Sequence, residues 1–171
     1  PTFRRSGSIE PNRINWQELI PHLREKFYGA SITVFLRLHP NLIGKVDTSS
    51  LQNSPEVIDM TRYHDMQELL CISDMLITDY SSSMFDYAML RRPCLLYATD
   101  VEQYDRGYYY DFCELPFPLA RDGEQLTKII EAFNHEEYLA ALDKFLNATL
   151  GIKERGIASE ELAKWMRRRM I

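Results

Sequence analysis

Apolar positions recur along this chain in two different patterns. Short apolar runs predict strands at residues 31–38, 56–60, 75–78 and 93–97. Longer segments repeat their apolar residues every three or four positions, which predicts helices at residues 15–28, 66–71, 82–90, 123–133, 136–150 and 159–170. Strands that alternate with helices in this way are typical of βαβ units. The sequence therefore predicts an α/β fold, with a Rossmann-like parallel sheet and helices on both of its faces.

The size and composition of the chain fit one globular domain over residues 1–171. Its 171 residues are 45% hydrophobic and 26% charged, which is close to the average for folded proteins. The chain begins at Pro1 rather than at a methionine, and its first residues resemble the end of a strand. We therefore expect this domain to be part of a longer protein.

Charge, cysteine spacing and hydropathy exclude several classes of protein. A net charge of -5 disfavours broad binding to nucleic acid, so we expect no nucleic-acid partner. Cys71, Cys94 and Cys113 lie too far apart for a zinc knuckle and are odd in number, which predicts buried, reduced thiols and no metal site. No apolar run approaches the roughly 20 residues of a membrane span.

Polar residues follow several of the predicted strands. Ligands of open α/β sheets bind beside the carboxyl ends of the strands, so these positions are candidate site residues. They are Arg4 and Arg5, His39 and Pro40, residues 79–83, and the segment after Tyr97.

Three consecutive serines stand where a strand gives way to a helix. Ser81, Ser82 and Ser83 follow Asp79 at the predicted start of the helix over residues 82–90. Free N–H groups and the positive end of the helix dipole favour an anion such as phosphate there. The alternative is that one serine only caps the helix, a contribution of about 1 kcal/mol that needs no ligand.

His39 and the segment Tyr104–Asp111 (YDRGYYYD) could also contact a phosphate. Proline after His39 keeps the histidine backbone extended, and the imidazole could then donate to a phosphate oxygen and protonate a leaving group. In YDRGYYYD, Arg106 could bind phosphate with two hydrogen bonds, and Gly107 would allow close approach of the backbone. The alternatives are a histidine bonded to a nearby carbonyl and an aromatic turn in which Arg106 pairs with an aspartate.

The final predicted helix combines a basic run with an apolar side. Lys164 and Arg167–Arg169 surround Trp165 and Met166, so this helix could contact an anionic membrane surface. A solvated helix end, whose cations complement the helix dipole, is the simpler alternative.

Taken in order, several motifs resemble those of the CDP-glycerol glycerophosphotransferase family of teichoic acid polymerases and primases. They are PTFRR, LRLHP, SDMLITDYSSSMFDYAML, the proline and tyrosine of RRPCLLY, and YDRGYYYDFCELPFP. The resemblance implies that this chain is the C-terminal, donor-binding half of a GT-B fold. It also implies that an acceptor hydroxyl attacks the β-phosphorus of CDP-glycerol, which releases CMP and forms a phosphodiester.

The resemblance also implies roles for individual residues. His39 is the expected catalytic residue near the diphosphate, and Ser81 and Ser82 are expected to bind the donor phosphates. With Arg5 and Arg106 nearby, these groups would neutralise the diphosphate. Asp79 is expected to orient a serine or to contact a donor hydroxyl, because its carboxylate would repel phosphate. Gly107 is the second residue expected to orient the donor.

The expected partners follow from the same reaction. The donor would be CDP-glycerol or CDP-ribitol, and the acceptor a polyol phosphate or a lipid-linked chain. We expect no cofactor and no metal, and we expect the general base to come from a missing N-terminal domain.

The protein would work in the cytoplasm, peripherally at the inner face of the membrane. Two alternatives stay open, a non-catalytic nucleotide-binding or interaction domain and a GT-B glycosyltransferase that uses a nucleotide sugar.

Overall fold

The computed structural model describes residues 13–45, 48–49, 52, 54–103, 107, 109–152 and 156–169. Its strands are β1 (Val34–Leu36), β2 (Val57–Asp59), β3 (Leu76–Thr78), β4 (Cys94–Tyr97) and β5 (Leu119–Ala120). Its α-helices are α1 (Trp16–Lys26), α2 (Met66–Ile72), α3 (Ser83–Ala88), α4 (Gly123–Ala132), α5 (His135–Lys144) and α6 (Ala158–Arg169).

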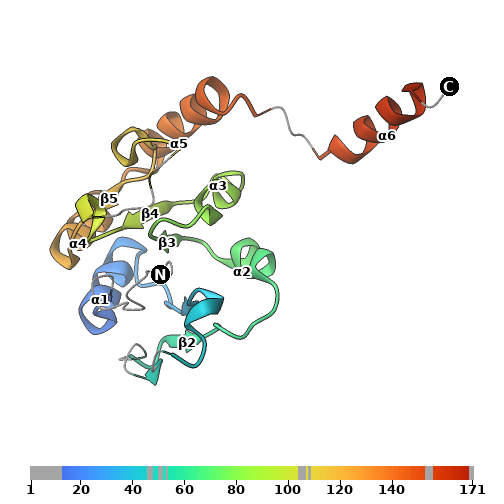
Figure 1. Cartoon of the computed structure of the whole chain (residues 1–171). Coiled ribbons are helices and arrows are strands. Elements are labelled where there is room, and N and C mark those ends of the chain that lie inside the picture. The colour runs from blue at the N-terminus through green and yellow to red at the C-terminus, as the bar shows by residue number, and fades with distance from the viewer. Residues whose placement is uncertain are drawn as a thin grey trace.

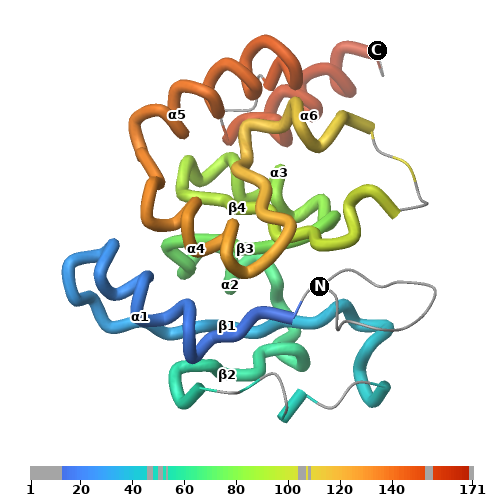
Figure 2. Tube along the Cα trace, turned by 90° about the vertical axis from the view of Figure 1, so that its left-hand side faces the viewer, coloured from blue at the N-terminus to red at the C-terminus, as the bar shows by residue number. Residues whose placement is uncertain are grey.

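All the strand pairs that the described residues form are parallel. β1 pairs with β2 in one ladder, and β3, β4 and β5 pair in that order in a second ladder. Figure 2 shows β1 lying between β2 and β3, with β4 beyond β3. The overall strand order is therefore 2-1-3-4-5, with hydrogen bonding broken between β1 and β3. The predicted α/β fold with a parallel sheet is confirmed.

The side chains of β4 divide the core into two layers. Cys94 and Leu96 pack with α3 and α5 in one cluster, whereas Leu95 and Tyr97 pack with α1 and α4 in another. Successive side chains of a strand point to opposite faces of its sheet, and all of β4 is buried. Helices therefore cover both faces of the sheet, as the sequence predicts (Figure 1).

The predicted elements are present, with differences at their ends. Strands β1 to β4 are three or four residues long and so shorter than the apolar runs that predicted them, and β5, with two residues, was not predicted from the sequence. The helix predicted over residues 136–150 begins at His135 and ends at Lys144, and a π-helix, η6 (Phe145–Thr149), follows it. The predicted strand end at the N-terminus lies outside the described residues.

Two further expectations concern the surface. Cys94 is buried, but Cys71 and Cys113 are exposed, so the prediction of buried thiols is wrong for these two. Cys71 lies in the last turn of the short helix α2, and Cys113 lies in a short 3-10 helix, η5 (Phe112–Glu114). No helix within the described ranges is both long and apolar enough to cross a membrane.

Candidate functional site

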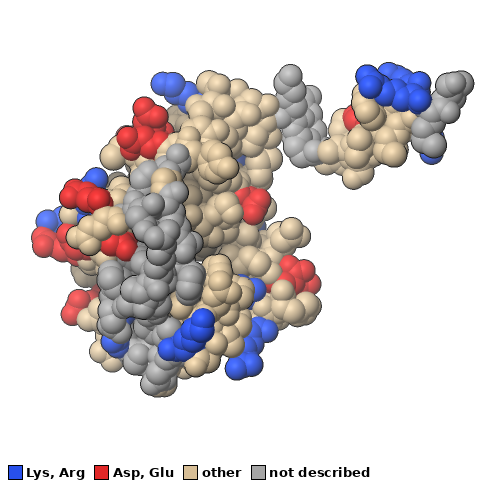
Figure 3. Space-filling model, in the orientation of Figure 1, with Lys and Arg blue, Asp and Glu red and all other residues tan. Residues whose placement is uncertain are grey.

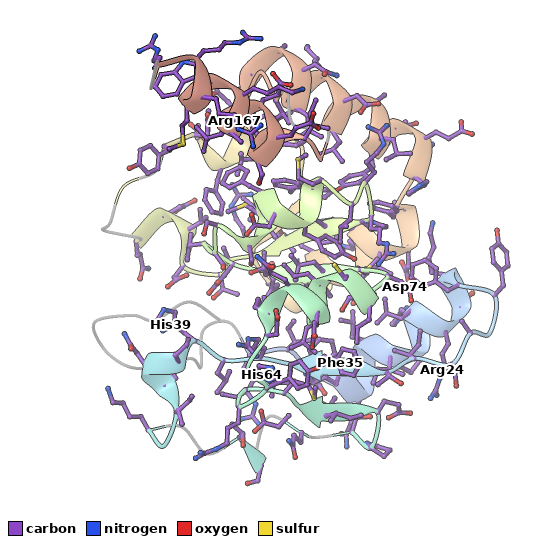
Figure 4. All side chains as sticks on the ribbon, turned by 90° about the vertical axis from the view of Figure 1, so that its right-hand side faces the viewer. Arg24, Phe35, His39, His64, Asp74 and Arg167 are labelled. Atoms are coloured by element: carbon purple, nitrogen blue, oxygen red, sulfur yellow. The ribbon has the colours of Figure 1, made fainter. Side chains whose placement is uncertain are left out.

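A cavity of about 720 Å³ lies between β1 and β3. Its walls are mostly apolar and come from α1, α2, β1 and β3, with Trp16, Leu36 and Ile77 among them. The cavity extends from Asp74, before β3, to His39, beyond β1, and Figure 4 shows these two residues on opposite sides of the molecule. It therefore runs along the break in the sheet, from the amino ends of the two strands to their carboxyl ends.

The carboxyl end of this cavity is the point where the strand order reverses. From β1 the chain adds β2 on one side, then returns to form β3 on the other side. In sheets of order 2-1-3-4-5, the loops after β1 and β3 diverge and leave a crevice, where ligands bind. The sequence places polar residues in both loops, and these residues line the cavity.

His39 comes from the loop after β1 and is half-buried at the cavity wall. It precedes a short 3-10 helix, η2 (Pro40–Leu42), and its Nδ1 accepts a hydrogen bond of 3.2 Å from the backbone N–H of Asn41. A neutral imidazole carries one proton, so an accepting Nδ1 leaves that proton on Nε2. The loop thus presents His39 as an Nε2–H donor. The alternative in the sequence analysis was a histidine bonded to a nearby carbonyl. The hydrogen bond at Nδ1 comes instead from a backbone N–H group.

Residues 79–83, called here the serine turn, form the loop after β3, and Asp79 and the serines line the same cavity. Ser81 Oγ accepts hydrogen bonds from the backbone N–H and the hydroxyl of Ser83, at 3.4 and 2.9 Å. Ser82 stands at the N-cap of α3, is exposed, and makes no capping hydrogen bond with its side chain. Ser81 therefore has a structural role at the helix start, whereas capping does not account for Ser82.

Asp79 is 2% exposed although it lines the cavity. Buried carboxylates need hydrogen-bond partners, and Asp79 does interact with another group of the chain. Its burial at the base of the serine turn fits the predicted orienting role better than direct contact with an anion.

Hydrogen bonds tie the ends of β1 and β2 together behind His39. The backbone N–H of Leu38 donates to Thr61 Oγ1 at 3.2 Å, and the N–H of Thr61 donates to Asp59 Oδ1 at 2.8 Å. Burial acts to raise the pKa of Asp59, but the hydrogen bonds from Thr61 and Thr48, together with the nearby charge of Arg62, outweigh burial and hold this pKa below its ordinary value. Asp59 therefore stays ionised at neutral pH and anchors the loop that carries His39.

Two arginines that the sequence analysis did not select, Arg13 and Arg37, also line the cavity. Arg37 Nη1 donates to the carbonyl oxygens of Met60 and Tyr63 at 3.1 and 2.5 Å. Arg37 lies two positions before His39, and a cation within an apolar strand was the signal that could have identified it. These arginines bring positive charge to the cavity wall.

The remaining predicted residues are not placed at the cavity. Arg5 and Arg106 lie outside the described residues, and Gly107 is not among the described residues that line the cavity. The φ angle of Gly107 is +73°, and a Cβ there would meet no atom within 4 Å. Glycine is thus favoured by its left-handed backbone conformation rather than by crowding. Within the described ranges, no group of three or more His, Cys, Asp or Glu side chains is arranged to hold a metal ion.

Comparison with known proteins identifies the family. The sequence model of the family described as CDP-Glycerol:Poly(glycerophosphate) glycerophosphotransferase matches residues 1–160. The chain belongs to this family. The match covers both loops that line the carboxyl end of the cavity, so the predicted resemblance is confirmed.

Its relatives include enzymes of both teichoic acid types. The chain is 32% identical over 169 residues to the teichoic acid ribitol-phosphate primase of Bacillus spizizenii, a match covering 97% of the chain and 42% of that protein. It is 36% identical over 141 residues to the teichoic acid poly(glycerol phosphate) polymerase of Staphylococcus epidermidis, covering 79% of the chain and 19% of that protein.

Solved structures of the wall teichoic acid polymerase TagF share the fold. A histidine variant of TagF superimposes with a TM-score of 0.69 at 30% identity, covering 98% of this chain and 42% of that one. A TagF variant soaked with CDPG gives a TM-score of 0.69 at 29% identity, with the same coverage. The chain thus spans less than half the length of these relatives.

Proposed function

We propose that this chain binds CDP-glycerol or CDP-ribitol as the donor-binding domain of a polyol-phosphate transferase in teichoic acid or related cell-wall or capsule synthesis. The proposal rests on one observation: His39 and the serine turn line the same end of one cavity, at the point where the strand order of the sheet reverses. The volume of about 720 Å³ suits a ligand of nucleotide size. Membership of the glycerophosphotransferase family supports the choice of donor.

The reaction under this proposal is an in-line displacement at phosphorus. An oxygen of the acceptor hydroxyl bonds to the β-phosphorus of the donor, while the bond from that phosphorus to the bridging oxygen breaks. The acceptor proton passes to a general base, which we place in a second domain of the longer enzyme. The products are a phosphodiester and CMP. Such a reaction needs mainly positioning and charge neutralisation, and we propose that no cofactor takes part.

In this proposal His39 acts on the leaving side of the reaction. Its Nε2–H donates to a diphosphate oxygen, where negative charge grows as the bridging bond breaks. Asn41 holds the ring through Nδ1, so the donor N–H is set before the ligand arrives. Ser81 and Ser82 supply hydroxyl and backbone donors from the serine turn, and Asp79 orients that turn.

The first experiment is an isothermal titration of the chain with CDP-glycerol. We expect His39→Ala to weaken binding about tenfold, because a charge-assisted hydrogen bond is lost. His64→Ala is the matched control, since His64 is exposed and is not one of the cavity-lining residues. Absence of binding of both CDP-glycerol and CDP-ribitol by the wild-type chain would contradict the proposal, whereas equal binding by His39→Ala would remove only the role of His39.

A competition titration then identifies the donor. CDP-ribitol is the second candidate, because the relatives include a ribitol-phosphate primase and a poly(ribitol-phosphate) polymerase. We expect one of these two CDP-polyols to displace the other and to bind more tightly than UDP- or CMP-sugars. Tighter binding of a nucleotide sugar would favour a GT-B glycosyltransferase instead.

We also propose that the protein works in the cytoplasm and that α6 contacts the inner face of the membrane. Figure 1 shows α6 apart from the other elements, and none of its residues is buried. Leu162, Trp165 and Met166 are 58%, 52% and 48% exposed. Arg167–Arg169 form its last turn, and Figure 3 shows a patch of Lys and Arg side chains on one side of the lobe that contains α6. Apolar and basic groups together suit an anionic lipid surface.

Sedimentation with lipid vesicles tests this contact. We expect the chain to pellet with phosphatidylglycerol vesicles and to stay in the supernatant with phosphatidylcholine vesicles. Changing Arg167, Arg168 and Arg169 to Gln should lower the affinity for these vesicles at least tenfold, because each cation near an anionic surface contributes about 1 kcal/mol to binding. The control changes Arg121, Lys128 and Lys144 to Gln, which removes the same charge elsewhere on the surface. Equal pelleting of both variants would contradict the proposal.

A further inference from the structure

Tyr80 stands in the middle of the serine turn but faces away from the cavity. Its neighbours Asp79 and Ser81 line the cavity, whereas Tyr80 is not one of the described lining residues. Its half-buried ring packs instead against the core cluster of α3, β4 and α5. The ring centroid lies 5.2 Å from that of Phe112. Tyr80 therefore supports the serine turn from the side opposite the ligand.

The hydroxyl of Tyr80 links the turn to the next loop of the sheet. It donates a hydrogen bond of 2.8 Å to Asp100 Oδ1. Asp100 follows β4, and Phe112 begins η5 further along the chain. One side chain thus joins the loop after β3 to two separate points of the connection between β4 and β5.

The contacts of the serines and of Tyr80 have different consequences. The hydrogen bonds between Ser81 and Ser83 fix the shape of the turn, since they act within it. They do not fix where the turn lies relative to β4. The contacts of Tyr80 reach 20 residues along the chain to Asp100, so they set the position of the turn in the fold.

We propose that Tyr80, held by Asp100, is a positioning residue for binding of the donor phosphates. It touches no donor atom, and it acts by keeping the serine turn where Ser81 and Ser82 meet the diphosphate. When a loop is correctly placed in only a fraction of the molecules, the apparent affinity for its ligand is reduced by that fraction. This inference rests on the proposed function, because it concerns the same cavity and the same ligand.

The test compares variants of the Tyr80–Asp100 pair by titration with CDP-glycerol and, in competition, with cytidine. We expect Tyr80→Phe and Asp100→Ala each to weaken CDP-glycerol binding about fivefold, as for loss of one hydrogen bond, and the double variant to weaken it no further. Cytidine has no phosphate, so its affinity should change less than about twofold. Asp100→Asn keeps an oxygen acceptor and should bind nearly as the wild type does.

Tyr63→Phe is the matched control, because the Tyr63 hydroxyl also donates to a carboxylate, Glu68 Oε2 at 2.5 Å, and Tyr63 is not one of the cavity-lining residues. Normal CDP-glycerol affinity in Tyr80→Phe, or equal losses for CDP-glycerol and cytidine, would overturn the inference. Failure of the wild-type chain to bind either CDP-glycerol or CDP-ribitol would contradict the proposed function instead.

Amide hydrogen exchange without ligand gives a second readout that does not depend on the donor. We expect Tyr80→Phe to speed exchange in residues 79–84 at least fivefold and to leave α4 unchanged, because only the tether of the turn is lost. Unchanged exchange in residues 79–84 would overturn the positioning role of Tyr80, whatever the ligand proves to be.

Discussion

Single hydrogen bonds decide which atoms face the cavity at its carboxyl end. The N–H of Asn41 occupies Nδ1 of His39, which leaves Nε2–H as the donor. Ser81 Oγ is engaged by Ser83, whereas Ser82 makes no capping hydrogen bond with its side chain. These neighbouring serines therefore differ in how much their side chains contribute to the fold.

Alanine substitutions separate contributions to the fold from contributions to ligand binding. We expect Ser82→Ala to weaken CDP-glycerol binding about fivefold, since one hydrogen bond to a charged group is lost, with no change in the free energy of unfolding. Ser81→Ala should weaken binding and also lower the free energy of unfolding by about 1 kcal/mol, because Ser81 receives the Ser83 N–H.

Titration calorimetry and urea unfolding measure the two quantities. Unchanged CDP-glycerol affinity in Ser82→Ala would contradict its role as a phosphate ligand. A free-energy loss in Ser82→Ala as large as that in Ser81→Ala would contradict the assignment of capping to Ser81.

The sequence predicted part of the candidate site at this scale. His39 and the serine turn were found because each follows an apolar strand, and the carboxyl ends of parallel strands share one edge of the sheet. Arg37 was not selected, although a cation inside the predicted apolar strand over residues 31–38 was a signal for it, because the sequence does not show that its side chain reaches a cavity. The tether from Tyr80 to Asp100 depends on which strands lie together, and one sequence does not state that.

At the scale of elements, local signals fixed the helices better than the strands. α4 begins with a reciprocal pair in which Asp122 Oδ1 accepts from the backbone N–H of Gln125 at 2.7 Å and Gln125 Nε2 donates to Asp122 Oδ2 at 2.8 Å. Such signals lie within four residues of sequence. β5 has two residues, and it is defined by pairing with β4 rather than by its own composition.

The side chain of Asp122 caps the start of α4. We expect Asp122→Ala to lower the free energy of unfolding by about 1 kcal/mol, because the N–H of Gln125 loses its acceptor. Asp122→Asn is the control, since its amide oxygen still accepts and the loss should be smaller. Urea unfolding measures both variants. Equal stability of Asp122→Ala and the wild type would contradict the capping role.

At the scale of the whole molecule, β4 holds the two layers of the core together. Its alternate side chains belong to different clusters, and its neighbours β3 and β5 pair with it on either side. The βαβ pattern of the sequence predicted this parallel core. The break between β1 and β3 was not predictable, because both strands are apolar in sequence whether or not they pair. That break provides the cavity on which the proposed function depends.

Hydrogen exchange with and without CDP-glycerol locates the donor site along the chain. We predict slower exchange at residues 37–42 and 78–84 when CDP-glycerol is bound, with no change in α4 and α5. His39→Ala should show this protection only at higher CDP-glycerol concentrations. Protection confined to other elements, or none at a concentration that saturates binding in calorimetry, would contradict a donor site between the carboxyl ends of β1 and β3.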